Sequence, residues 1–110
     1  MLDKLEKTYK LIETLKAALP FEVALMPELI LDLAQHEKPL LLKPIETVSE
    51  ISYLGDAGGI VCHIEPEGAD GMVVTSITHV RVPRTLPFAA AVVEYQRNRA
   101  KKLRKRQPAF

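Results

Sequence analysis

The sequence contains a single cysteine, Cys62, among its 110 residues. One cysteine cannot form a disulfide within the chain, and a zinc site would have to draw on other residue types. No apolar run approaches the length of about 18 residues that a membrane-spanning helix needs, and no apolar signal segment opens the chain. These absences predict a protein of a reducing, cytoplasmic setting with no membrane partner.

Motifs of catalysis and cofactor binding are also missing. The stretch from Gly55 to Gly59 lacks the lysine and the serine or threonine of a phosphate-binding loop, and the sequence predicts a strand rather than a helix after it. A hairpin turn explains it better. Cys62 and His63 are chain neighbours, so on a strand they point to opposite faces and cannot act as a nucleophile and its base. We therefore expect a protein that is not an enzyme and has no cofactor.

The composition is that of one soluble domain. Apolar residues make up 47% of the chain and charged residues 26%, which suits a single domain with a genuine core. No internal repeat or low-complexity linker divides the chain. The sequence predicts one α+β domain over residues 1–110, ending in a basic helical tail at residues 97–110.

Stretches rich in Val, Ile and Thr predict the strands around which the fold is built. The expected strands cover residues 46–54, 59–66 and 72–82. Turn residues separate them, so the three strands would form an antiparallel meander with the helices packed on one face. Pro83 ends the last strand because proline has no N–H to donate to a ladder.

The register of the second hairpin depends on its loop. A three-residue loop of Ala69, Asp70 and Gly71 would place Gly71 at the left-handed position of a bulge and pair His63 with Ile77. Because side chains alternate along a strand, they would then fall into two sets. The expected core set is Ile60, Cys62, Ile64, Val74, Ser76, Thr78, Val80 and Val82, and the second set is Val61, His63, Glu65, Val73, Thr75, Ile77, His79 and Arg81. A change of one residue in loop length would exchange these partners.

The two sets predict different roles. Cys62, in the core set, is expected to be buried and unreactive. The second set mixes apolar and ionisable side chains, which is typical of an interaction surface. We therefore expect a homodimer interface that buries Val61, Val73 and Ile77.

The same second set offers an alternative based on its histidines. His63 and His79 would be diagonal neighbours on one face with Glu65 nearby. Two histidines and a glutamate can bind zinc or form an enzyme pocket, but the ligand spacing usual for zinc is missing. We expect histidines of the surface or of the interface, and no metal.

Apolar residues at helical spacing predict three helices. The first carries the stripe Leu2, Leu5, Tyr9, Ile12, Leu15 and Leu19, the second spans residues 27–38, and the third carries the stripe Phe88, Ala91, Val92, Tyr95 and Leu103. On the first helix, Asp3 with Lys7 and Glu6 with Lys10 are expected to form acid–base pairs one turn apart. Two segments stay open: residues 21–26 fit a strand or a helical turn, and residues 40–45 an edge strand or an extended connection.

The net charge of +1 conceals an asymmetry. Whereas the rest of the chain has eight basic and fourteen acidic residues, the segment 97–106 has seven basic residues and no acidic one. Its basic residues are Arg97, Arg99, Lys101, Lys102, Arg104, Lys105 and Arg106. Dense lysine and arginine beside the aromatic ring of Tyr95 is typical of contact with a phosphate backbone.

These observations favour a small non-catalytic binding or regulatory protein that binds DNA or RNA through the basic tail. No base-reading motif accompanies the tail, so binding should not depend on sequence. The alternatives are a solvated helix end and a structural or adaptor homodimer whose tail docks on an acidic neighbouring subunit. Truncation after Gln96 is expected to abolish nucleic-acid binding and to leave the fold intact.

Overall fold

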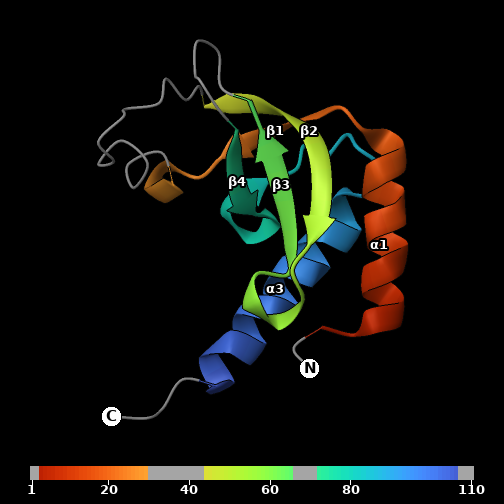
Figure 1. The fold of residues 1–110 in the computed structure, drawn as a ribbon, viewed down its shortest axis with the longest axis vertical. Coiled ribbons are helices and arrows are strands. Elements are labelled where there is room, and N and C mark those ends of the chain that lie inside the picture. Colours follow the sequence, from red (N-terminus) through yellow and green to blue (C-terminus); the bar gives the residue numbers. More distant parts are fainter. Residues whose placement is uncertain (1–2, 30–43, 66–71, 107–110) are drawn as a thin grey trace.

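The computed structural model describes residues 3–29, 44–65 and 72–106 of the chain, with the backbone alone for 105–106. Five antiparallel strands form a sheet curved into a half-barrel, and two long helices pack against it (Figure 1). The elements are α1 (Leu5–Ala18), β1 (Phe21–Leu25), β2 (Ile45–Tyr53), η1 (Gly55–Ala57), β3 (Ile60–Ile64), β4 (Val73–Ser76), η2 (Ile77–His79), β5 (Val80–Arg81) and α3 (Ala89–Arg106). Residues 27–29 add a helical turn, and the rest of the predicted second helix lies outside the described residues.

The α+β class is confirmed, but the three-stranded meander is wrong. The strand order is β4-β3-β2-β1-β5. Strand β1, whose sequence was compatible with either a strand or a helical turn, lies between β2 and β5 and pairs with both. Residues 40–43 of the second open segment are outside the described residues. A strand as short as β1 has too few residues for its periodicity to identify it, so its partners decide its conformation.

The predicted strand at residues 72–82 is broken by a turn. Ser76 caps the short helix η2, because its hydroxyl accepts a hydrogen bond from the backbone N–H of Thr78 at 3.2 Å. After this turn Val80 pairs with Leu25 of β1 and not with β3. Serine and threonine compete with strand pairing by bonding to nearby backbone groups, which explains why a stretch of high strand propensity changes direction here.

The predicted register of the β3–β4 hairpin is also wrong. His63 pairs with Val74 and Cys62 with Thr75. Ile64 and Val73 form the last described pair of the ladder on the loop side, and the predicted loop at residues 69–71 lies outside the described residues. The partner of His63 is thus three residues earlier in the chain than predicted, and a shift by an odd number exchanges the two faces of β4. Val73, predicted on the second face, is buried, and Val74, predicted in the core set, is exposed.

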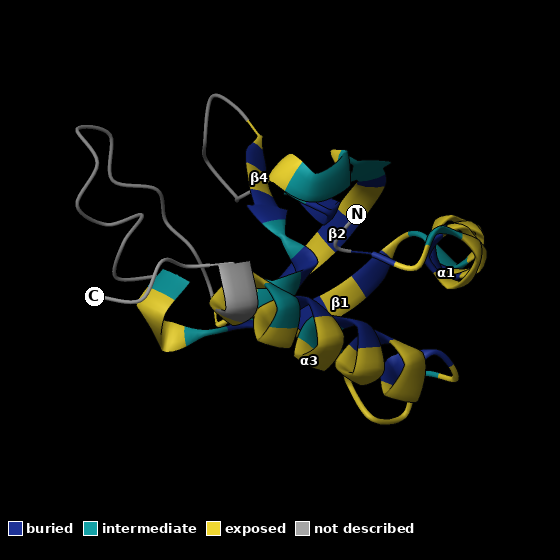
Figure 2. Ribbon diagram, turned by 90° about the horizontal axis from the view of Figure 1, so that it is seen from below, coloured by how far each residue is buried: buried dark blue, intermediate teal, exposed yellow. Residues whose placement is uncertain are grey.

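One core lies between the sheet and the two helices. Strands β1, β2 and β3 contribute most of it, with Cys62 completely buried as predicted. Helix α1 buries Thr8, Leu11, Ile12 and Leu15, whereas Tyr9 of the predicted stripe is exposed. Helix α3 and the residue before it bury Phe88, Val92 and Tyr95, whereas Ala91 and Leu103 are exposed. Figure 2 shows exposed residues along much of the solvent side of α3.

Candidate functional site

Arg99 of α3 lies inside the protein and forms an ion pair with Asp3. Its Nη1 donates to both carboxylate oxygens of Asp3 at 3.1 Å, and its Nη2 donates to the backbone carbonyl of Asp56 at 2.8 Å. The two side chains are only 4% and 2% exposed. Arg99 therefore belongs to the fold and is not a cation that a partner can reach.

Two tyrosines complete this buried network. The hydroxyls of Tyr53 and Tyr95 donate to Oδ2 of Asp3 at 2.8 and 3.0 Å, and the Ile60 N–H donates to the Tyr95 hydroxyl at 3.1 Å. Burial, together with the negative charge of Asp3, raises the pKa of Tyr95 to about 12, and the same causes raise the pKa of Tyr53. Both hydroxyls stay protonated near neutral pH and hold the segment before α1 against α3 and the sheet.

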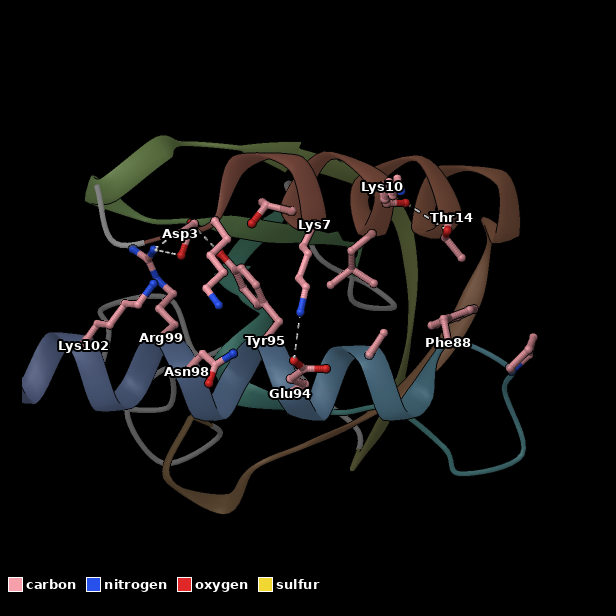
Figure 3. A pocket seen from close by; sticks show the side chains of 15 residues that line it. Asp3, Lys7, Lys10, Thr14, Phe88, Glu94, Tyr95, Asn98, Arg99 and Lys102 are labelled. Atoms are coloured by element: carbon pink, nitrogen blue, oxygen red, sulfur yellow. Dashed lines mark hydrogen bonds and ion pairs between the residues drawn. The ribbon is translucent and has the colours of Figure 1, made fainter.

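A cleft of about 420 Å³ opens beside this network between α1 and α3 (Figure 3). Its floor includes the buried side chains of Leu11, Phe88 and Tyr95. We call this space the interhelical cleft. An apolar floor between packed helices is a common setting for a ligand site.

Lysines surround the interhelical cleft. Lys4, Lys7 and Lys10 line it from the α1 side, and Lys102 lines it from α3. Residues three apart lie on one side of a helix, so the first three lysines form a row. Glu94 is the one exposed acidic residue that the described part of the chain places in the lining, and it lies 3.6 Å from the Lys7 Nζ. Lys7 therefore pairs across the cleft and not with Asp3, contrary to the sequence-based expectation.

A second, smaller hollow of about 190 Å³ adjoins the cleft. It is lined by Lys4, Asn98, Lys101 and Lys102, and we call it the lysine hollow. Among the described residues no carboxylate lies within ion-pair distance of its three ammonium groups. Three lysines without a described counterion and one amide line this space, and such a set of donors favours an anion with several acceptor oxygens.

The structure divides the seven predicted tail residues. The side chains of Arg97, Lys101 and Arg104 are exposed, and Lys102 is half-buried at the cleft. Arg99 is buried, and the side chains of the last two residues of α3 lie outside the described part. Truncation after Gln96 would remove Arg99 and leave the buried Asp3 carboxylate without its counterion. We therefore expect this truncation to destabilise the fold, in contrast to the sequence-based prediction, and unfolding of the truncated protein would test it.

The sequence did not identify the contribution of α1 or of Asn98 to this surface. The three-residue spacing of Lys4, Lys7 and Lys10 was a usable signal, because it places three cations on one side of the helix. Their proximity to α3 depends on helix packing and has no local signal.

The three predicted interface residues are covered within one chain. Val61, Val73 and Ile77 are 4%, 8% and 0% exposed. Val73 and Ile77 belong to the core because of the register offset and the turn at η2. These side chains therefore offer no apolar surface to a second copy.

The two histidines of the predicted pair do not converge. His63 lies with its Nε2 2.8 Å from the Ser52 Oγ and its Nδ1 3.1 Å from the Met72 Sδ. His79 lies with its Nδ1 3.3 Å from Oγ1 of Thr75, whose strand partner is Cys62 on the core face. Within the described ranges, no group of three or more His, Cys, Asp and Glu side chains is arranged to hold a metal ion.

Comparisons with models of known protein families, with curated proteins and with solved structures found no match to this chain. In the described part of the chain, no helix combines the length and the apolar character needed to cross a membrane.

Proposed function

We propose that this protein binds nucleic acid through the phosphate backbone, without reading base sequence. The binding surface consists of the lysine hollow, the exposed cations of α3 and the lysine row of α1. The observation that carries the proposal is the lysine hollow, where Lys4, Lys101 and Lys102 converge without a described counterion. Phosphate is the anion that such a set of donors suits and that nucleic acid repeats along its length.

The position of the buried network supports this proposal. Asp3, the chain neighbour of Lys4, is paired with Arg99 inside the protein, so its carboxylate cannot repel a phosphate at full strength. Arg97 and Arg104 extend the exposed positive charge along α3. A phosphate backbone that enters the hollow can follow these side chains.

Salt dependence tests the proposal. We expect about four phosphate contacts, which corresponds to a slope of about −3 to −4 in log affinity against log salt. The affinity for DNA or RNA of unrelated sequence should be similar, since the contacts are to the backbone. Fluorescence anisotropy at 50 to 200 mM salt (about the range in which such contacts lose affinity most visibly) measures both properties.

Two triple variants of equal net charge separate a local site from general attraction. The site variant changes Lys4, Lys101 and Lys102 to Gln, and the control variant changes Lys16, Arg81 and Arg84 to Gln. The control residues are exposed and line neither the cleft nor the hollow. The site variant should lose most of the affinity and about 3 units of slope, and the control variant should keep both.

Three results would overturn the proposal. The first is negligible binding by the unmodified protein at low salt, and the second is equal loss in the two variants. The third is a dimer that sedimentation detects in the unmodified protein and in the control variant but not in the site variant, while none of these proteins binds nucleic acid. That third result would establish instead the homodimer with a docking tail.

A further inference from the structure

We infer that the interhelical cleft takes one unpaired nucleobase of a single strand while a neighbouring phosphate of that strand lies in the lysine hollow. The inference rests on the proposed function and specifies its substrate class. The interhelical cleft and the lysine hollow adjoin, because Lys4, Asn98 and Lys102 line both. Because the two spaces adjoin at these three side chains, one ligand can extend from the cleft into the hollow.

The two spaces differ in chemistry. The hollow is lined by three lysines and an amide, whereas the floor of the cleft includes Leu11, Phe88 and the ring of Tyr95. The ring of Phe88 is fixed by an edge-on contact with Phe21 at 5.2 Å between centroids. Tyr95 is fixed by its hydroxyl in the buried network. A ligand that fills both spaces would join an anionic group to an apolar group, as a nucleotide does.

The size and polar rim of the cleft fit a base. Its volume of about 420 Å³ lies in the range of about 300–1,000 Å³ typical of small-ligand sites. Asn98 offers an amide donor and acceptor to a base edge or a sugar. The Thr14 hydroxyl donates to the Lys10 carbonyl at 2.9 Å, so it offers its oxygen as an acceptor. Among the described residues that line the cleft, no set of donors selects one base, which agrees with binding that does not depend on sequence.

The Lys7–Glu94 ion pair crosses the cleft but does not close it. Its side chains are 71% and 61% exposed and its charged atoms are 3.6 Å apart. Exposed pairs of this kind contribute little, so a ligand can displace this one. Lys7 would then be available to a second phosphate.

This inference reverses the order of affinities that charge alone predicts. A duplex has the higher charge density, so attraction by lysines alone favours duplex over single strand. A paired base inside a duplex cannot enter the cleft, whereas an unpaired base can be buried there. We expect the single strand to bind more tightly than the duplex of the same length.

The experiment compares three fluorescent probes of equal length by anisotropy: a mixed-sequence single strand, its duplex and an abasic single strand with the same phosphates. The single strand should bind about tenfold more tightly than the abasic strand. The Ala91→Phe variant fills the cleft without changing charge. Ala100→Phe is its matched control, because both alanines are exposed on α3 and only Ala91 lines the cleft.

We expect Ala91→Phe to reduce the affinity for the single strand to that for the abasic strand and to leave the affinity for the duplex unchanged. Ala100→Phe should change neither affinity. Equal affinity for the single and abasic strands, with the salt slope retained, would overturn the base site and leave the proposed function standing. Negligible affinity of the unmodified protein for all three probes would overturn both the base site and the proposed function. A poly-glutamate peptide provides a further test. If it binds the unmodified protein as tightly as the single strand does, and if the Ala91→Phe variant no longer binds it, the occupant is an acidic peptide and the inference is overturned.

Discussion

Replacing Asp3 by alanine should destabilise the protein more than the loss of any exposed charge. The carboxylate accepts two hydrogen bonds from Arg99 at 3.1 Å and one from each of two tyrosine hydroxyls, at 2.8 and 3.0 Å. The Arg99 side chain is 4% exposed in the intact protein, and without the carboxylate it would keep, among the described residues, the carbonyl of Asp56 as its acceptor. Removing one partner of a buried pair costs about 3–5 kcal/mol, because the other charge is left uncompensated.

Urea unfolding followed by circular dichroism measures this effect. A loss of this size is a large part of the roughly 5–15 kcal/mol that stabilises a domain and should lower the melting temperature by about 12–20 °C. Glu6→Ala is the control, since Glu6 is an exposed acid in the first turn of α1. Adding Arg99→Met to Asp3→Ala should recover part of the loss, because no buried charge then remains. A loss in Asp3→Ala no larger than that in Glu6→Ala would refute the assignment of this pair as a structural anchor.

Three further predictions concern single residues. Burial raises the pKa of the Cys62 thiol to about 12, so at pH 8 a thiol reagent should label folded protein slowly and unfolded protein fast; fast labelling of folded protein would contradict the burial. Gly59→Ala would place a Cβ 2.5 Å from the Tyr95 hydroxyl of the buried network, whereas the Cβ of Gly55→Ala, at a similar positive φ, would meet nothing within 4 Å. Gly59→Ala should therefore lower the unfolding free energy by clearly more than the roughly 1 kcal/mol expected of Gly55→Ala. Equal losses in urea unfolding would show that backbone strain alone matters. Glu94→Gln should increase oligonucleotide affinity severalfold, because it removes the exposed acid of the cleft. Its control is Glu13→Gln, which changes an exposed acid outside the cleft and should raise the affinity less. Equal gains in anisotropy titrations would show that affinity depends only on net charge.

Local patterns predicted the elements that are long or strongly periodic. The strands β2 and β3 and the helices α1 and α3 all lie where apolar spacing and turn residues indicated them. The prediction failed where non-local pairing decides the conformation. Strand β1 has five residues and is defined by its two neighbours, and the β3–β4 register depends on a loop length that no local signal fixes.

Arg99 shows how a charge pattern can mislead. Counting Lys and Arg placed it with the exposed tail, yet it continues the buried stripe of Phe88, Val92 and Tyr95 at steps of four, three and four residues. Helical periodicity therefore indicated an inward position, and a buried arginine requires a counterion. What the sequence could not supply was the identity of that counterion, because Asp3 is 96 residues away along the chain.

The stability of the fold and the geometry of the proposed site depend on the same anchor. Asp3 holds the start of the described chain against α3, and Lys4, the next residue, lines the lysine hollow together with Lys101 and Lys102. Without that anchor, Lys4 would lose the neighbour that fixes it beside α3, and the three ammonium groups would lose their common position. Asp3→Ala should therefore reduce nucleic-acid affinity even under conditions in which the variant is fully folded, although the substitution makes the protein more positive. Charge alone predicts the opposite sign, so an increase in affinity would show that the cations act as a diffuse field and not as a site with defined geometry.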